Sequence, residues 1–464
     1  MTPIDGQPIL TAAEMRAAEE RAIAAGSSVE DLMERAGAGV AEAVRRLTAG
    51  APVLVLCGPG NNGGDGYAAA RILKANGVPV RVTSCADPRS AAAVAARQAF
   101  AGEVESIDRA DGAPVVVDAL FGTGLSRPLD PSSQQALARL TGGARLSFAV
   151  DLPSGITTDD GALLGHVPHI DITLALGALK PAHLLQPAAA MCGAVRLVDI
   201  GLKHVTSDCR ALARPDLGPP PVDAHKYSRG LVAIVGGEMP GAGALAAEAA
   251  MRAGTGYVLL FDDQGSAGAP HALVRRKWSV AALRKALDGK KAAAIVVGPG
   301  LGRGKDAERK LDAAIAIAVP LVIDGDALHL LDKDRLAALG KRTGGTVLTP
   351  HVGEFKAAFG EYAGSKIEAT RRAAAKSGAT VVFKGPDTVI ATPTGQAVVA
   401  PAASSWLSTA GTGDVLAGAV GVMLAAGEGP EAAIWLHGEA ARRLGGAFIA
   451  DDLARELGAV RASL

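Results

Sequence analysis

The sequence predicts two different α/β domains, of which the first has a parallel sheet with helices on both faces. The chain has 464 residues, which is too long for a single hydrophobic core. Short Val- and Leu-rich runs alternate with helical patterns, as expected of parallel strands buried on both faces. This pattern stops at three consecutive prolines, Pro219–Pro221, which neither a helix nor a central strand accommodates. We therefore expect one domain over residues 1–213, a proline-rich linker over 214–224 and a second domain over 225–464.

Two helices are expected to open the chain, before the first strand. Thr11 and Glu14 have the spacing of a capping box, and Gly26 ends the helical pattern that follows them. Ser27 and Glu30 repeat that spacing and predict the start of the second helix. The apolar runs that we expect to form strands of the first domain are 52–57, 79–85, 114–122, 146–155 and 172–177.

The second domain repeats the alternation with different sequences, so the two halves are not copies of one another. Its expected strands are the apolar runs within 230–237, 293–302, 320–328, 345–355 and 379–385. The last third is helical, with patterns over 411–427 and 430–446.

Composition excludes several classes of function. The formal net charge is zero and aromatic residues make up 3% of the chain, so neither nucleic acid nor an acidic membrane is an expected partner. The four cysteines (Cys57, Cys85, Cys192 and Cys209) are scattered without metal-ligand spacing, which favours free thiols in a reducing compartment. No signal peptide and no membrane-spanning apolar stretch is evident, so we expect a cytoplasmic protein.

A glycine-rich turn between a strand and a helix stands out in the first domain, in the segment "VLVLCGPGNNGGDGYAAARIL", Val53–Leu73. Gly58, Gly60 and Gly63 fit GxGxxG, but this match alone is weak evidence for dinucleotide binding. Asp65 lies at the expected helix start, where its charge would repel a pyrophosphate. An acid and two asparagines suit a cation, or hydroxyl and amide groups, better than phosphate oxygens.

Two further aspartates, Asp118 and Asp151, end expected strands of the same domain. Strand ends of an open parallel sheet line one crevice, where ligands bind. Asn62, Asp65 and Ser154 would join the two aspartates there. A single aspartate in such a position is more often a turn or helix cap, but three beside glycine-rich and Ser-Gly turns favour a binding site.

The motifs "GPGNNGGDGYAAARIL", "DALFGTGLSRP" and "DLPSG", with "LMERAG" before them, resemble the NAD(P)HX epimerase domain over about 210 residues. That family has a Rossmann-like fold and interconverts the R and S epimers, at C6, of a hydrated nicotinamide cofactor. The resemblance implies that Asp118 and Asp151 are catalytic. It implies a potassium ion bound by Asn62, Asp118 and Ser154. The implied substrate-binding residues are Asn61, Asn62, Gly63, Gly64, Asp65, Gly122, Thr123, Gly124, Leu125, Ser126, Arg127, Pro128 and Asp151, with Arg127 and the adjoining amides near the phosphates.

The second domain carries another glycine-rich helix start, "STAGTGDVLAGAVG", Ser408–Gly421. Its amides can form an anion hole for a transferred phosphoryl group, and Asp414 can take a proton from an attacking hydroxyl. The plainer interpretation is an ordinary helix start with Asp414 interacting with the helix dipole. A P-loop is excluded because no segment fits GxxxxGK[ST].

Several other segments, "HKYSRG", "GPGLGRG", "VIDGDAL", "LTPHVGEF" and "VFKGPDT", accompany this helix start. Together they resemble the ribokinase-like fold, and more closely its ADP-dependent NAD(P)HX dehydratase branch. That branch phosphorylates the hydrate with ADP and eliminates phosphate, which implies ADP as co-substrate and Mg²⁺. The resemblance implies hydrate contacts at Ala242, Gly302, His351 and Asp414, with Asp414 as the catalytic base. It implies nucleotide contacts at Lys384, Gly385, Pro386, Asp387, Thr388 and Gly413. Ala410, His329 and Trp406 depart from the usual family residues.

The two resemblances together predict one enzyme that epimerises NADHX and NADPHX and dehydrates the S epimer. One alternative is a ribokinase-like kinase acting on a sugar or a hydroxymethylpyrimidine. A second is that the first domain is a noncatalytic binding module. Such folds often form homo-oligomers, but the sequence does not fix the oligomeric state.

Overall fold

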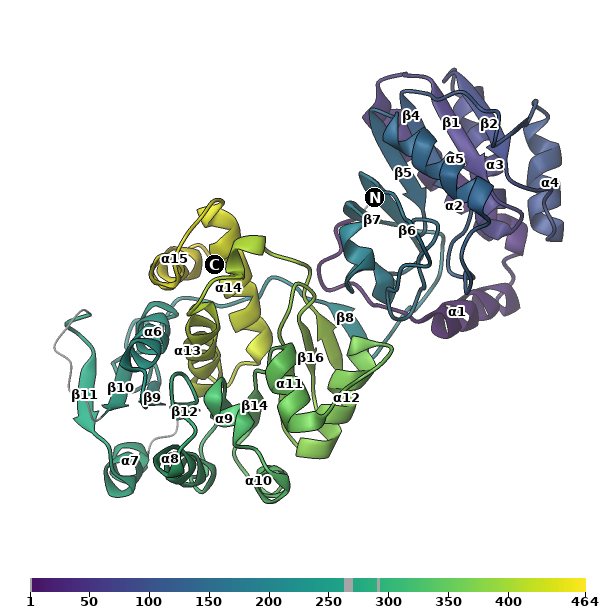
Figure 1. Cartoon of the computed structure of the whole chain (residues 1–464). Helices are drawn as coiled ribbons and strands as arrows, with labels where there is room; N and C mark the ends of the chain where they lie inside the picture. The colour runs from purple at the N-terminus through teal and green to yellow at the C-terminus, as the bar shows by residue number, and fades with distance from the viewer. Residues whose placement is uncertain (1, 263–269, 290–292) are drawn as a thin grey trace. The chain divides into compact units, whose positions relative to one another are not determined.

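The computed structural model describes residues 2–262, 270–289 and 293–464. The chain divides into two compact units, Met1–Ala211 and Leu212–Leu464. Each unit contains its own sheet and helices (Figure 1). Both units therefore confirm the predicted α/β class.

The first unit begins with two helices, α1 (Ala12–Ala24) and α2 (Val29–Thr48). The predicted capping box of α1 is confirmed: Thr11 Oγ1 accepts from the Glu14 amide, and Glu14 accepts from the Thr11 amide. The predicted box of α2 is wrong by one residue, because Ser28 and Asp31 form it. Ser27 and Glu30 have the same spacing as Ser28 and Asp31, so spacing alone cannot distinguish the two pairs.

The sheet of the first unit is parallel throughout, with strand order β3-β2-β1-β4-β5-β6-β7. Its strands are β1 (Val53–Cys57), β2 (Val80–Ser84), β3 (Glu105–Ser106), β4 (Val115–Ala119), β5 (Leu146–Val150), β6 (Ile172–Leu176) and β7 (Ala194–Val198). The helices after the first strands are α3 (Asn61–Ala75), α4 (Ala91–Phe100) and α5 (Pro131–Gly142), and a short strand, β8 (Cys209–Ala211), ends the unit.

Alternate residues of β1 enter two separate hydrophobic cores, as strands covered on both faces must. Val53 and Val55 belong to the core that includes residues of α2 and α3. Leu54 and Leu56 belong to the core that includes Leu137 and other residues of α5. This double burial explains why the strand reads as a continuous apolar run.

The second unit has a larger sheet, in which its strands follow the order β11-β10-β9-β12-β13-β14-β15-β16-β17. The strands from β11 to β15 pair in parallel, whereas β16 and β17 are antiparallel to their neighbours. They are β9 (Leu231–Val235), β10 (Tyr257–Asp262), β11 (Val274–Lys277), β12 (Ala293–Val297), β13 (Leu321–Ile323), β14 (Thr346–Leu348), β15 (Thr380–Phe383), β16 (Val389–Ala391) and β17 (Ala397–Val399).

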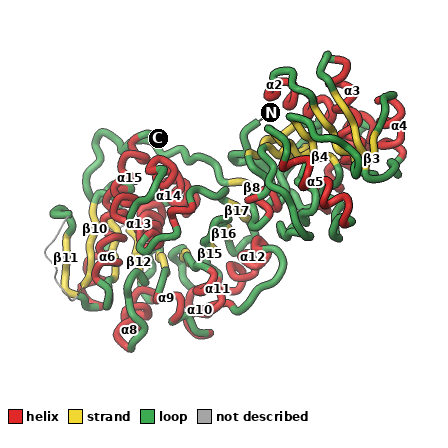
Figure 2. The backbone as a smooth tube through the Cα atoms, turned by 45° about the horizontal axis from the view of Figure 1, so that its top comes forward, coloured by secondary structure: helices red, strands yellow, loops and turns green. Residues whose placement is uncertain are grey.

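Helices cover this sheet on both sides (Figure 2). On one side α13 packs against β9, β12 and β13 and against α6 and α14. Its glycines permit this close approach, since a Cβ on Gly418 would lie 2.1 Å from the Ala246 carbonyl oxygen. The helices are α6 (Pro240–Arg252), α7 (Val280–Leu287), α8 (Lys305–Ile315), α9 (Asp326–His329), α10 (Lys333–Leu339), α11 (Val352–Phe359), α12 (Lys366–Ser377), α13 (Thr412–Ala425), α14 (Pro430–Leu444) and α15 (Ala450–Ala462).

The segment that leads into the second unit is hydrogen-bonded to that unit. The Leu212 amide donates to the Val399 carbonyl (2.9 Å), and the Arg461 guanidinium donates to the carbonyls of Leu217 and Gly218 (2.8 and 2.6 Å).

The four cysteines are free thiols, three of them buried, as the sequence predicts. In the described parts of the chain, none of the helices has the length and apolarity that crossing a bilayer requires.

Candidate active sites

In the first unit, the turn from β1 to α3 packs tightly against the end of β4. A Cβ on Gly58 would lie 1.8 Å from the Leu120 carbonyl oxygen, and one on Gly63 would lie 1.9 Å from the Gly58 carbonyl oxygen. Glycine is therefore a steric requirement at both positions. The exposed Asn61 begins α3, and its Oδ1 accepts from the Ser90 hydroxyl (2.6 Å). The sequence predicts Asp65 at the start of the helix. In the structure it is buried one turn inside α3.

Asp118, in β4, joins two loops through a fully buried carboxylate. Its Oδ1 accepts from the Ser154 hydroxyl (2.7 Å) and the Leu120 amide (3.1 Å), and its Oδ2 accepts from the Ser154 amide (2.8 Å). The Ser154 hydroxyl in turn accepts from the Phe121 amide (2.9 Å). Burial raises the pKa of Asp118, and the hydrogen bonds from Ser154 oppose that rise. Asp118 therefore fixes both loops, and its Oδ2 retains capacity for one further ligand.

Asp151 follows β5 and has a positive φ of 65°, an uncommon conformation for a residue with a side chain. Its Oδ1 accepts from Lys180 Nζ (2.5 Å) and from the Leu176 amide (3.2 Å). Lys180 has no exposed surface and also donates to the Leu176 carbonyl (2.7 Å). Asp151 and Lys180 therefore form a buried ion pair at the carboxyl end of β5.

His183 supports this pair from the short 3-10 turn Pro181–His183. Its Nδ1 accepts from the Lys180 amide (2.9 Å), so its Nε2 carries the proton and donates to the Asp151 carbonyl (2.7 Å). Burial and the charge of Lys180 lower the pKa of His183 to about 4, so the ring is neutral. Sequence reasoning missed Lys180 and His183, since no recurring local spacing links them to Asp151.

Gly122 lies where the predicted residues of the first unit meet. A Cβ on it would lie 3.0 Å from Asn62 Oδ1 and 3.3 Å from Asp151 Oδ2. The amide nitrogen of Asn62 is buried and has no hydrogen-bond partner in the structure. Burial, Asp151 and Glu19 raise the pKa of Asp65 well above its usual value, while Lys180 opposes the rise. An unpaired donor next to two buried carboxyl groups is suited to binding a polar ligand.

The segment after Gly122 forms the more open side of this arrangement. The Thr158 hydroxyl donates to the Thr123 carbonyl (2.9 Å) and holds the start of the segment. Gly124 and residues 126–128, which include Arg127, are exposed, whereas Leu125 is half-buried. Gly63 and Gly64 are buried in the first turn of α3.

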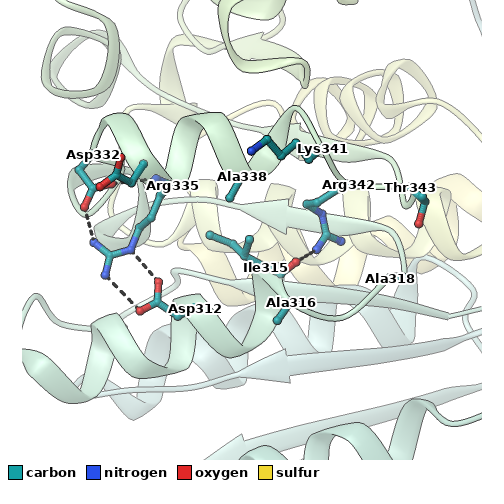
Figure 3. A pocket seen from close by; sticks show the side chains of 11 residues that line it. Asp312, Ile315, Ala316, Ala318, Asp332, Arg335, Ala338, Lys341, Arg342 and Thr343 are labelled. Carbon is teal, nitrogen blue, oxygen red and sulfur yellow. Dashed lines mark hydrogen bonds and ion pairs between the residues drawn. The ribbon is translucent and has the colours of Figure 1, made fainter.

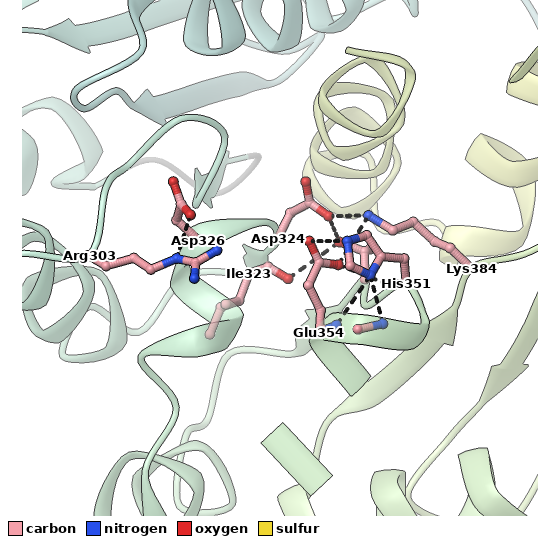
Figure 4. Close-up of polar contacts among 9 residues, drawn as sticks. Arg303, Ile323, Asp324, Asp326, His351, Glu354 and Lys384 are labelled. Atoms are coloured by element: carbon pink, nitrogen blue, oxygen red, sulfur yellow. Dashed lines mark hydrogen bonds and ion pairs between the residues drawn. The ribbon is translucent and has the colours of Figure 1, made fainter. Parts of the chain in front are cut away.

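In the second unit, Lys384 lies between two buried acids directly after β15 (Figure 4). Its Nζ is 2.7 Å from Asp324 Oδ1 and 3.7 Å from Glu354 Oε2. The Thr349 hydroxyl also donates to Asp324 Oδ1 (2.6 Å). Burial lowers the pKa of Lys384, but the charges of Asp324 and Glu354 outweigh it and raise the pKa overall. Lys384 is therefore charged.

Asp414 lies in the first turn of α13, beside this lysine. The N-cap of α13 is Gly411, with φ 88°, and a Cβ on Gly413 would lie 3.4 Å from Lys384 Nζ. Burial and the charge of Asp324 raise the pKa of Asp414 to about 7; Lys384 lowers it, and Glu354 and Asp326 add to the rise. A carboxyl group that titrates near neutrality at a helix N-terminus can exchange protons beside a site for developing negative charge.

His351 and Gly302 are held by the neighbouring acids. His351 caps α11, and its amide donates to Glu354 Oε2 (2.8 Å). The Gly302 amide donates to Asp326 Oδ2 (3.0 Å), and Arg303 Nε donates to Asp326 Oδ1 (2.9 Å; Figure 4). Ala242 adjoins the same loop, since a Cβ on Gly300 would lie 2.9 Å from its Cβ.

Within the predicted nucleotide segment, the backbone folds onto its own side chains. The Gly385 amide donates to Thr388 Oγ1 (3.2 Å), and Asp387 is buried. Pro386 and Thr388 lie in the turn between β15 and β16.

Among the described residues, no group of three or more His, Cys, Asp and Glu side chains is arranged to hold a metal ion.

A hollow of about 650 Å³ lies elsewhere in the second unit, between α8 and α10 (Figure 3). Its arginines are already engaged: Arg335 pairs with Asp312 and Asp332, and Arg342 donates to the Ile315 carbonyl. None of the residues that the sequence predicts to be functional lines this hollow. The predicted site residues lie instead near the carboxyl ends of strands, such as β4 and β5 in the first unit and β13 and β15 in the second.

The fold and these two groups of residues define a two-domain α/β enzyme, with one acid–lysine site in each unit. Residues 232–460 match the family model described as "NAD(P)H-hydrate dehydratase", and residues 29–182 match the one described as "YjeF-related protein N-terminus". Both matches agree with the resemblances that the motifs predict.

Curated relatives span both units. A protein from Mycobacterium tuberculosis (strain CDC 1551 / Oshkosh) is 38% identical over 415 residues, covering 85% of each chain. One from Thermofilum pendens is 34% identical over 457 residues, covering 89% of this chain and 87% of its own. Both are named "Bifunctional NAD(P)H-hydrate repair enzyme Nnr". A solved Bacillus subtilis structure, of an ADP/ATP-dependent NAD(P)H-hydrate dehydratase co-crystallised with ATP and Mg²⁺, is 27% identical and covers 53% of this chain and 94% of its own, with a TM-score of 0.45. The chain belongs to the family of bifunctional NAD(P)H-hydrate repair enzymes.

Proposed function

We propose that the two units catalyse consecutive steps in the repair of hydrated NADH and NADPH. The first unit interconverts the R and S epimers at C6. The second unit removes water from the S epimer at the expense of ADP, which yields NAD(P)H, AMP and phosphate. The observation that carries this proposal is the position of Asp414, which lies in the first turn of α13 beside the charged Lys384 and has a pKa of about 7.

In the second unit, Asp414 accepts the proton of the hydrate's hydroxyl as that oxygen attacks the β-phosphorus of ADP. The amides at the start of α13 stabilise the negative charge that develops on the transferred phosphoryl group. Lys384 and the segment Lys384–Thr388, with Gly413, hold the nucleotide, while Ala242, Gly302 and His351 hold the hydrate. The C6–O bond then breaks and phosphate leaves with its electron pair while the ring nitrogen stabilises the positive charge at C6. Loss of a proton from C5 forms the C5–C6 double bond, which restores the dihydronicotinamide.

Two cations fit the donors that are present. Asn62, Asp118 and Ser154 offer amide, carboxylate and hydroxyl oxygens, which suit K⁺ as a hard cation. Asp324, Asp326 and Glu354 all contribute negative charge near Asp414, and although they do not form a metal site by themselves, they would attract Mg²⁺ that arrives with the phosphates of ADP. Bound Mg²⁺ supplies positive charge that offsets the charge of the phosphates.

In the first unit, epimerisation requires a bond at C6 to break and to form again on the opposite face. Asp151, which is paired with Lys180, accepts a proton during this exchange. The raised pKa of Asp65 suits it to donate one. Asp118 fixes the loops that carry Phe121, Gly122 and Ser154 around the substrate. The unpaired amide nitrogen of Asn62 donates to the substrate, with the remaining contacts made by Asn61, Gly63, Gly64 and Thr123–Pro128.

The test is the recovery of absorbance at about 340 nm from a mixture of R- and S-NADHX, with purified protein, Mg²⁺, K⁺ and either ADP or ATP. We expect full recovery with ADP, after slow spontaneous epimerisation is subtracted. Asp151→Asn should leave only the S fraction recoverable, and Asp414→Asn should abolish recovery. Consumption of ADP without recovery, together with accumulation of a phosphorylated product, would instead indicate the kinase alternative.

A further inference from the structure

A buried lysine outside the predicted site residues holds the two ends of the nucleotide segment together. Lys366 is the first residue of α12, and 10% of its side chain is exposed. Its Nζ donates to Asp387 Oδ1 (2.6 Å) and to the Asp387 carbonyl (3.0 Å), and lies 3.5 Å from the Lys384 carbonyl oxygen. One ammonium group therefore contacts both Lys384 and Asp387.

Aromatic rings and a glycine complete the environment of this ammonium group. Its nitrogen is 4.4 Å from the centre of the Phe383 ring, which stacks on Phe355 at 4.1 Å. A Cβ on Gly385 would lie 2.8 Å from Lys366 Nζ, so the backbone of the segment lies close against the ammonium group. Burial lowers the pKa of Lys366, and the charge of Asp387 opposes that change. The contacts fix the conformation of the segment from its buried side.

Lys366 also determines the charge of the segment. Asp387 has only 9% of its side chain exposed, and a nucleotide bound to this segment brings phosphate groups of the same sign. The paired ammonium cancels the charge of Asp387 before the nucleotide binds. Without it, the buried Asp387 carboxylate would lose the positive charge of Lys366 while an anionic ligand lies beside it, and two carbonyl groups would lose a donor.

We propose that Lys366 is a positioning residue for the adenine nucleotide of the second unit. It shapes the segment Lys384–Thr388 and neutralises Asp387, and it touches neither the hydrate nor the reacting atoms. This inference rests on the proposed nucleotide site. It assigns Lys366 an effect on ADP affinity that is separate from the chemistry of Asp414.

The test is calorimetric titration of ADP, in excess Mg²⁺, into the full-length protein and its variants. Lys366→Met should weaken ADP binding at least about tenfold, the loss expected for hydrogen bonds to a charged group. Lys366→Arg should restore part of the affinity. Lys366→Met combined with Asp387→Asn should bind ADP more tightly than Lys366→Met alone, because no uncompensated charge remains. Lys376→Met, which removes an exposed lysine of α12, is the matched control and should bind like the unmodified protein.

Steady-state kinetics separates positioning from a general structural defect. Lys366→Met should raise the KM for ADP and leave the KM for S-NADHX within about twofold, whereas a loosened fold would change both. ADP binding by Lys366→Met within about twofold of the unmodified protein would overturn the proposal, as would equal rises in both KM values. If Lys366→Met does not fold, Lys366→Gln replaces it under the same criteria. Failure of the proposed function is detected independently, as absence of absorbance recovery by the unmodified protein.

Discussion

Replacing Glu354 by Gln should move the pH profile of the dehydratase reaction to lower pH. Burial and the negative charges around Asp414, including that of Glu354, raise its pKa to about 7, and Lys384 acts in the opposite direction. A catalytic base is active only when it is ionised. Removing one of the negative charges lowers the pKa of Asp414, so more of the base is ionised at low pH.

The size of the effect follows from the pKa. With a pKa of about 7, roughly one eleventh of Asp414 is ionised at pH 6 and ten elevenths at pH 8. The unmodified enzyme should therefore gain about tenfold in kcat/KM between these two values. Glu354→Gln should reduce that gain, and Lys384→Met should shift the midpoint upward.

The assay is the initial rate of ADP-dependent recovery of absorbance from S-NADHX across this pH range. Phosphate groups of the nucleotide also titrate near pH 6, so the informative quantity is the shift between variants under identical nucleotide and Mg²⁺. Asp414→Asn should lower the rate by about 10²–10⁴ at every pH. A Glu354→Gln midpoint that stays unchanged or rises would refute Asp414 as the titrating base.

Two further predictions concern the buried pairs and rings. Lys180→Met should lower the free energy of unfolding of the first unit by about 3–5 kcal/mol, because the Asp151 carboxylate stays buried without its partner. It should also abolish epimerisation but spare dehydration of pure S-NADHX; urea unfolding and the two assays check this, and unchanged stability would contradict it. His437 is buried in α14, its Nε2 lies 2.9 Å from the Thr412 carbonyl oxygen, and burial lowers its pKa to about 4, as it does for His183. Each unit should therefore lose up to about 3 kcal/mol of stability as the pH falls from about 6.5, where the unfolded imidazole takes its proton, to 4. His437→Gln should flatten this slope in urea titrations of the second unit, and an unaltered slope would exclude the linkage.

Local sequence patterns were sufficient to predict the α/β class and the strands that precede the site loops, but they did not predict β7, β10, β11 or the antiparallel strands β16 and β17. Five-residue apolar runs followed by helical patterns identify parallel strands because both faces of each strand are buried, as Val53 and Leu54 illustrate in β1. The same reasoning gave the wrong start for α2 by one residue. Ser27 and Ser28 each precede an acid by three residues, and the sequence spacing does not say which of them caps the helix.

The partners of the acids were not predictable in this way. Asp151 meets Lys180, 29 residues later, and Asp324 meets Lys384, 60 residues later. Both contacts depend on how loops at the ends of neighbouring strands fold back, and no short sequence period encodes that. Lys366 was missed for the same reason, since its partner Asp387 lies 21 residues away.

The two buried lysines explain how each site obtains a carboxyl group with a raised pKa. In each unit one buried lysine pairs with one acid, Lys180 with Asp151 and Lys384 with Asp324. A second acid lies close enough to feel the negative charge of the first, and its burial is only partly offset by the lysine. The pKa of that second acid rises, strongly for Asp65 and to about 7 for Asp414. In each unit, one of two neighbouring acids is paired with the lysine and the other has a raised pKa, an arrangement that suits acid–base chemistry on a hydrated nicotinamide.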